Sequence, residues 1–172
     1  AETKLLNTGG KYHTLLSKRF DRQNSKRIHF ASAMTMLGLS DGCDANTGNG
    51  YLDIVDFIMQ SCVNVESNLK ELFRRVAFFI RIGNSDDHFR NHGFILTREG
   101  WTLSPAYDIN PTTSDYQSLL INRDSNESSL DLLLDASKDY MISRDVACSI
   151  INEVEEAVST WRSIATRLRI PK

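Results

Sequence analysis

Residues 83–93 read GNSDDHFRNHG, a dense run of ionisable and amide side chains. The run follows directly on residues 66–82, in which leucine, valine, isoleucine and phenylalanine recur at helical spacing. Because most of the later circumference of this segment is apolar, we expect a deeply buried helix. A buried helix is a rigid support, so the sequence predicts a functional loop at its C-terminal end.

A β-hairpin is predicted immediately after this loop. Apolar residues alternate in segments 94–97 and 101–104, around a short glycine-containing loop. A hairpin returns the chain to the place where it began, so residues just before its first strand lie near residues just after its second. Asn91 and Asp108 are therefore expected to meet in space, with Asp86 close by at the other end of its loop.

These residue types favour magnesium chemistry. Two or three carboxylates in one pocket repel one another when ionised, so they need a cation. Oxygen ligands from one Asp, one Asn and substrate phosphates are what Mg²⁺ prefers, because it dehydrates reluctantly and keeps few protein ligands. A free carboxylate five residues before the Asn is then placed to orient or deprotonate an attacking hydroxyl group.

The order of these residues is that of the protein-kinase C-lobe. There a catalytic-loop Asp is followed by an Asn that holds Mg²⁺ and, after a hairpin, by a metal-binding Asp. The His-Arg-Asp and Asp-Phe-Gly letters of eukaryotic kinases are absent here, which disfavours that class.

The same stretches, SDDHFRNHGF (85–94) and LSPAYDIN (103–110), resemble the C-terminal kinase domain of the HipA family. Members of this family are bacterial toxin serine/threonine kinases of toxin–antitoxin systems. The stretches SKRFDR (17–22) and RIHFASAMTMLG (27–38) resemble the family's hinge strand and following segment, and GNGYLDIVDFI (48–58) also fits. The resemblance covers nearly the whole chain.

The resemblance implies a mainly helical α+β fold, a protein-kinase-like C-lobe with an N-terminal β-hairpin. Residues 1–22 would form the hinge hairpin, and residues 23–172 would form the helical lobe with its catalytic-loop hairpin. The phosphate loop and lysine of a kinase are not found before Asp86 and would belong to an N-terminal lobe absent from this chain. Alone, the chain is expected to bind ATP and Mg²⁺ weakly and to phosphorylate little or nothing.

Roles for the loop residues follow from the same resemblance. Asp86 would be the catalytic base or the residue that orients the hydroxyl group, and Asn91 and Asp108 would hold Mg²⁺. His88 and Arg90 match polar positions of the catalytic loop and would contact phosphate or the base.

The nucleotide pocket is also implied by resemblance alone. Tyr107 would help to form it, and Phe20 in the hinge strand would pack near the adenine. The role of Asp87 is left open.

Partners are implied in the same way. They are ATP, a protein substrate with aminoacyl-tRNA synthetases as known family targets, and a helix-turn-helix antitoxin of the HipB type. DNA would be contacted only through the antitoxin, and no membrane is involved.

Two alternatives compete with a kinase. One is a metal-dependent phosphoesterase with two metal ions, which would use Asp86, Asp87, His88, His92 and Asp108. The other is a non-catalytic, partner-binding remnant of a kinase. His88 and His92 could also be read as a zinc pair, although no Cys or third His lies nearby in the sequence.

The rest of the chain gives further expectations. A β-hairpin is predicted over residues 1–20, and the triplet Gly9-Gly10-Lys11 within it lacks the Walker spacing. Short and longer helices are predicted over residues 30–37 and 51–62. A long helix is predicted over residues 143–168, with Trp161 in its apolar core stripe. Residues 114–129 give no clear pattern.

Composition sets the outer limits. The chain has 172 residues and a net charge of −2, which disfavours a protein that coats nucleic acid. No apolar run reaches the ~18 residues of a membrane span, and no signal-peptide core is present. Three widely spaced cysteines without a CxxC pair fit a reducing, cytoplasmic location.

Overall fold

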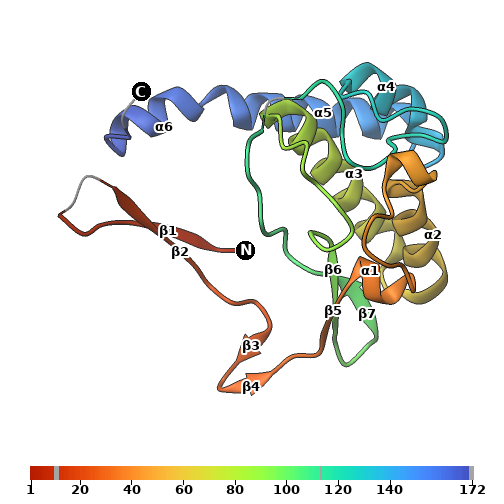
Figure 1. Cartoon of the computed structure of the whole chain (residues 1–172), viewed down its shortest axis with the longest axis horizontal. Helices are drawn as coiled ribbons and strands as arrows, with labels where there is room; N and C mark the ends of the chain where they lie inside the picture. The colour runs from red at the N-terminus through yellow and green to blue at the C-terminus, as the bar shows by residue number, and fades with distance from the viewer. Residues whose placement is uncertain (10–11, 113, 171–172) are drawn as a thin grey trace.

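The computed structural model describes residues 1–9, 12–112 and 114–170, and the helix α3 (Val65–Ile82) lies at its centre. Helix α5 (Arg144–Ser159) packs along α3, and α2 (Tyr51–Ser61) and α4 (Leu130–Asp135) pack against other parts of it (Figure 1). The predicted helices over 66–82 and 51–62 are therefore present to within one residue at each end. The buried side chains of α3 include Leu69, Leu72, Phe73, Val76 and Ala77.

Gly83 ends α3 in a left-handed conformation, with φ of +72°. A β-carbon at this position would lie 2.8 Å from the carbonyl oxygen of Thr112, so glycine also allows a distant segment to approach closely. The Thr112 N–H donates to the Gly83 carbonyl at 2.6 Å. The end of the buried helix is thus joined to the chain that follows the predicted hairpin.

A three-stranded antiparallel sheet lies beside the helices, in the order β5–β6–β7. Strands β6 (Gly93–Leu96) and β7 (Trp101–Leu103) form the predicted hairpin. The predicted helix over 30–37 is wrong at its start, where β5 (Phe30–Ser32) pairs with β6. Only α1 (Ala33–Met36) is helical, and Ser32 caps it. Local periodicity missed β5 because its pairing partner lies far along the chain.

The N-terminal region forms an arm that projects from the helical body (Figure 1). Strands β1 (Thr3–Asn7) and β2 (His13–Ser17) pair in an antiparallel hairpin, as predicted. A second, smaller hairpin follows, made of β3 (Arg22–Gln23) and β4 (Lys26–Arg27). Of the triplet discussed above, Gly10 and Lys11 lie outside the described residues.

The predicted long helix over 143–168 is two helices, because α5 ends at Ser159 and α6 (Trp161–Arg167) follows Thr160. The hydroxyl groups of Ser159 and Thr160 donate to backbone carbonyls of the preceding turn, a contact that bends helices. The prediction that Trp161 belongs to the core is also wrong, since 57% of this residue is exposed. Helix α6 extends beyond the body that covers α5 (Figure 1).

Residues 114–129 are irregular but not peripheral, because Leu119 and Ile121 are fully buried in the core. Two short 3₁₀ helices, Ala45–Thr47 and Ala136–Lys138, complete the α+β fold. None of the helices in the part of the chain that the structure describes is long and apolar enough to cross a membrane.

Candidate active site

Two loops meet at the C-terminal end of α3: loop 84–92, which precedes β6, and loop 104–112, which follows β7. The Tyr107 hydroxyl donates to the backbone carbonyl of Arg90 at 2.5 Å. The Asn110 N–H donates to the side-chain oxygen of Asn84 at 3.3 Å. The hairpin therefore brings the two loops together as the sequence predicts.

Asp86 and Asn91 lie at the two ends of a short turn within loop 84–92. The Asn91 Nδ2 donates to the Asp86 carbonyl at 3.1 Å, and the Asn91 N–H donates to the His88 carbonyl at 2.8 Å. Asn91 is buried, whereas Asp86 is exposed. The side-chain nitrogen of Asn91 is used to hold the turn, which leaves its Oδ1 as the atom able to face a cation.

Asp108 occupies an unusual backbone position in loop 104–112. Its φ is +54°, a left-handed conformation that is uncommon for a residue with a side chain. The Asp108 Oδ1 accepts a hydrogen bond from Asn110 Nδ2 at 2.9 Å, and the residue is otherwise exposed. Among the described residues no hydrogen bond joins the side chains of Asn91 and Asp108; the bonds between their loops hold them in one region. Strained positions of this kind cluster at functional sites.

The donor atoms of these residues suit a hard cation. Within residues 1–9, 12–112 and 114–170, no three His, Cys, Asp or Glu side chains converge as they would around zinc or a two-metal centre. One Asp and one Asn, completed by phosphate oxygens, need no such cluster and fit Mg²⁺. The chemistry of the donor set therefore agrees with the metal ion that the sequence predicts.

An aromatic cluster stands beside Tyr107. The ring centroid of Tyr107 lies 5.7 Å from that of Phe20 and 5.9 Å from that of Phe30. The ring centroids of the two phenylalanines are 5.7 Å apart. Burial raises the pKa of Tyr107 to about 12, so its hydroxyl keeps the proton that it donates to loop 84–92. The resemblance assigns both Phe20 and Tyr107 to a nucleotide pocket, and this role stays a prediction; Phe30, which the sequence assigned to a helix, joins their cluster.

The two remaining loop residues have different surroundings. Arg90 points to the surface, where its guanidinium forms an ion pair with Asp41. His88 is half-buried. The structure thus places both in loop 84–92, and Asp41 is a partner that the sequence did not indicate.

Asp86 opens onto a surface groove of about 430 Å³. Most of the groove is lined by polar side chains from the 3₁₀ helix at Ala45–Thr47 with its N-cap, Asp44, and from residues 112–126. These include Asp44, Asn46, Thr112, Ser114, Gln117 and Asn126. No basic side chain lines the groove among the described residues.

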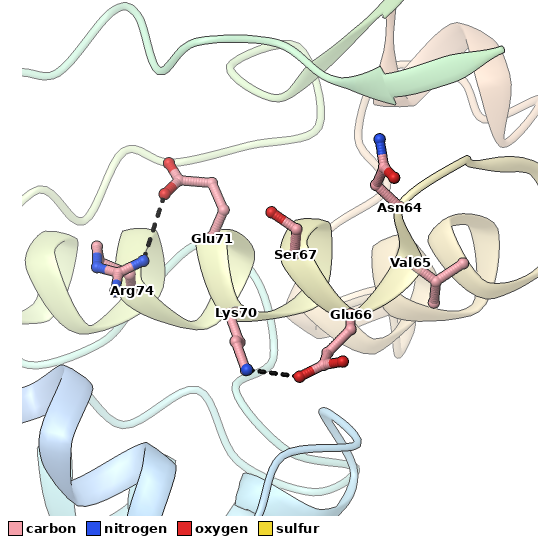
Figure 2. A pocket seen from close by; sticks show the side chains of 7 residues that line it. All are labelled: Asn64, Val65, Glu66, Ser67, Lys70, Glu71 and Arg74. Atoms are coloured by element: carbon pink, nitrogen blue, oxygen red, sulfur yellow. Dashed lines mark hydrogen bonds and ion pairs between the residues drawn. The ribbon is translucent and has the colours of Figure 1, made fainter. Parts of the chain in front are cut away.

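A larger hollow of about 590 Å³ lies along the first half of α3, at the other end of the helix (Figure 2). Its charged groups compensate one another: Lys70 pairs with Glu66 at 2.5 Å, and Arg74 pairs with Glu71 at 3.7 Å. None of the predicted site residues lines it. The polar groove at Asp86 is therefore the better candidate.

Comparisons with known proteins show the family and the fold of the chain. The family described as "HipA-like C-terminal domain" matches residues 1–161. A Haemophilus influenzae protein named "Putative kinase" is 30% identical over 113 residues, which are 60% of this chain and 33% of that protein. The "Serine/threonine-protein kinase toxin HipA" of Shewanella oneidensis is 27% identical over 119 residues, 58% of this chain and 27% of that protein.

A solved structure has the same fold. It is titled as the HipA, HipB and operator DNA complex of the Shewanella oneidensis toxin–antitoxin system, and it matches with a TM-score of 0.78 at 18% identity. The match covers 99% of this chain and 46% of the other. The chain thus spans a third or less of the two curated relatives and about half of the structural one.

Proposed function

The chain belongs to the family of HipA-like C-terminal domains, and from this membership we propose that it is the catalytic lobe of a serine/threonine protein kinase. The lobe would transfer the γ-phosphoryl group of ATP to a protein hydroxyl group. The single observation that carries the proposal is the meeting of loops 84–92 and 104–112 through Tyr107 and Arg90. The contact joins the two loops that carry a free carboxylate, an Asn and a second Asp, which follow one another in the order seen in the protein-kinase C-lobe.

Asp86 would orient the acceptor hydroxyl group and take its proton. Its carboxylate is exposed and faces the polar groove, so an acceptor segment of another protein can reach it. The groove carries the carboxylates of Asp44 and Asp86 and no cation among its lining residues, which disfavours an acidic acceptor segment. His88 and Arg90 would support the same loop and stand near the transferred phosphate.

Asn91 and Asp108 would hold Mg²⁺ through Oδ1 and a carboxylate oxygen. When bound, the metal ion would neutralise charge on the phosphates of ATP. The bond from Asn91 Nδ2 to the Asp86 carbonyl fixes the distance between the metal ligand and the base. Asp108 would be held in its left-handed conformation by loop 104–112.

Phe20, Phe30 and Tyr107 would form an apolar platform for the adenine. Aromatic rings 5.7–5.9 Å apart present the kind of surface on which a planar base packs. Tyr107 would join this platform to the catalytic loop, because its ring belongs to the cluster and its hydroxyl group holds Arg90.

Phosphoryl transfer also needs a phosphate loop and a lysine that contacts the phosphates, and we assign neither of them among the residues of this chain. The matched segments make up 33% and 27% of the two curated relatives. A helix-turn-helix antitoxin of the HipB type is the proposed partner, by likeness to the complex named above. The isolated chain should then bind Mg²⁺ and ATP weakly and transfer little phosphate.

Calorimetric titration of the full-length polypeptide with a non-hydrolysable ATP analogue and Mg²⁺ tests the proposed site. Asp108→Ala should weaken binding about tenfold or more, because it removes the one carboxylate ligand. Asp124→Ala is the matched control, since Asp124 is exposed and lies outside the site. Equal affinities of the two variants would contradict the proposed metal site.

A metal-dependent phosphoesterase is a second candidate, because the site contains the Asp and His side chains that such enzymes use as metal ligands. The described residues form no cluster for two metal ions, which argues against it. Hydrolysis of a phosphate ester with Mn²⁺ and without ATP would favour it over a kinase.

A further inference from the structure

Asp87 follows Asp86 directly but points into the protein. Its side chain is fully buried, as are those of Tyr51 and His92. The Asp87 Oδ2 accepts a hydrogen bond from the Tyr51 hydroxyl at 2.8 Å and lies 2.6 Å from His92 Nε2. One carboxylate therefore connects loop 84–92 to the first residue of α2 and to the residue that precedes β6.

A carboxylate is rarely buried unless its partners compensate for lost water. Here both partners are themselves held by rigid elements. The ring of His92 packs edge-on against Tyr51 of α2 at 5.7 Å and against Phe79 of α3 at 6.1 Å. Burial and the charge of Asp87 raise the pKa of Tyr51 well above its usual value, so its hydroxyl group remains a donor.

The buried Arg75 of α3 holds the start of loop 104–112. The Arg75 Nη2 donates to the Ser104 carbonyl, at the start of loop 104–112, at 2.8 Å and pairs with Glu71 at 3.2 Å. Burial lowers the pKa of Arg75, and the carboxylates of Glu71 and Asp87 partly offset this effect. The buried carboxylate of Asp87, in loop 84–92, thus interacts electrostatically with the buried guanidinium of Arg75, which holds loop 104–112.

Two hydrogen bonds join the first half of loop 84–92 to its last two residues. In the first, Asn91 Nδ2 donates to the Asp86 carbonyl. In the second, Asp87 Oδ2 and His92 Nε2 form a buried hydrogen bond, and His92 is the next residue after Asn91. The two contacts join neighbouring residue pairs, 86 with 91 and 87 with 92.

We infer that Asp87, fixed by Tyr51 and His92, is a positioning residue that holds Asp86 and Asn91 at their working separation. Its catalytic consequence rests on the proposed kinase function. A displacement of about 1 Å at reacting groups costs roughly 10²-fold in rate. Weaker hydrogen bonding of Asp87 would therefore lower turnover, although no group that touches substrate is removed.

Tyr51→Phe in the full-length polypeptide tests this inference, with Tyr140→Phe as the matched control. Both tyrosines are fully buried, and each donates one buried hydrogen bond, Tyr51 to Asp87 and Tyr140 to the Ile121 carbonyl at 2.7 Å. Both substitutions remove one hydroxyl group from the interior, and the loss in global stability should be larger for Tyr51→Phe because its acceptor is a carboxylate. Only Tyr51→Phe removes a donor from Asp87, which then keeps His92 as its one hydrogen-bond partner among the described residues.

Two measurements separate the outcomes. Amide hydrogen exchange of residues 84–92 should rise about tenfold or more in Tyr51→Phe relative to Tyr140→Phe, as expected for locally weakened structure. The kcat for phosphoryl transfer should fall about tenfold in Tyr51→Phe alone, with the KM for ATP within about twofold.

Equal exchange of the loop in the two variants would overturn the inference, whatever the activity. Faster exchange in Tyr51→Phe, together with a wild-type protein that transfers no phosphate, would uphold the positioning role and refute the proposed function instead.

Discussion

At the scale of single residues, the site depends on two backbone positions with positive φ, Gly83 and Asp108. Gly83 ends the buried helix and permits the close approach of Thr112, so the start of loop 84–92 is fixed against loop 104–112. Asp108 adopts a similar conformation with a side chain, which the surrounding loop must maintain. The backbone at these two positions therefore contributes to the geometry of the site, together with the side-chain hydrogen bonds of Asn91 and Asp87.

Gly83→Ala should destabilise the protein more than Gly48→Ala does. Both glycines end helices with similar φ, +72° and +80°, and each substitution costs about 1 kcal/mol through this conformation. Only the β-carbon at position 83 meets a backbone atom, the Thr112 oxygen at 2.8 Å. We expect about 1–3 kcal/mol of additional loss in the free energy of unfolding, measured with urea. Equal losses would show that Thr112 does not constrain Gly83.

The candidate site could be predicted from sequence where its parts are close along the chain. Asp86, Asn91 and Asp108 flank one short hairpin, so hairpin geometry alone indicated that their loops meet. Phe30 and Tyr51 were missed because they reach the site from β5 and α2, which are placed by tertiary packing. A buried Asp beside an exposed one also has no local signature in the sequence.

At the scale of elements, helical periodicity located α2 and α3 but did not show which apolar faces are covered. The stripe of α5 continues into α6, yet Val154 is buried and Trp161 is exposed. The difference arises because α3 and its neighbours cover only the first part of the stripe (Figure 1). The strand β5 was missed for a related reason, since pairing with β6 decides its conformation.

Trp161→Ala should change stability far less than Val154→Ala, although it removes a larger side chain. Val154 lies in the core, so its truncation should lower the free energy of unfolding by about 1–3 kcal/mol. Trp161 is more than half exposed and lines an open hollow beside Ile82 and Pro111, so its truncation should stay within about 0.5 kcal/mol. Urea unfolding of both variants provides the comparison. A larger loss for Trp161→Ala would mean that α6 packs against the body.

At the scale of the whole molecule, a helical body carries the candidate site and a hairpin arm projects beside it (Figure 1). The site lies at the end of α3 where the sheet and the second half of the chain converge, so each part of the body contributes to it. The arm supplies little buried surface, and its Leu15 is 65% exposed.

Phosphoryl transfer by the full-length polypeptide is the most direct test of the central claim. Incorporation of labelled γ-phosphate into protein should require Mg²⁺, and Asp86→Asn should reduce it about 10²–10⁴-fold, as expected for loss of a general base. Asp124→Asn, at an exposed aspartate away from the site, should leave it unchanged. Undiminished labelling by Asp86→Asn would show that Asp86 is not the general base of phosphoryl transfer.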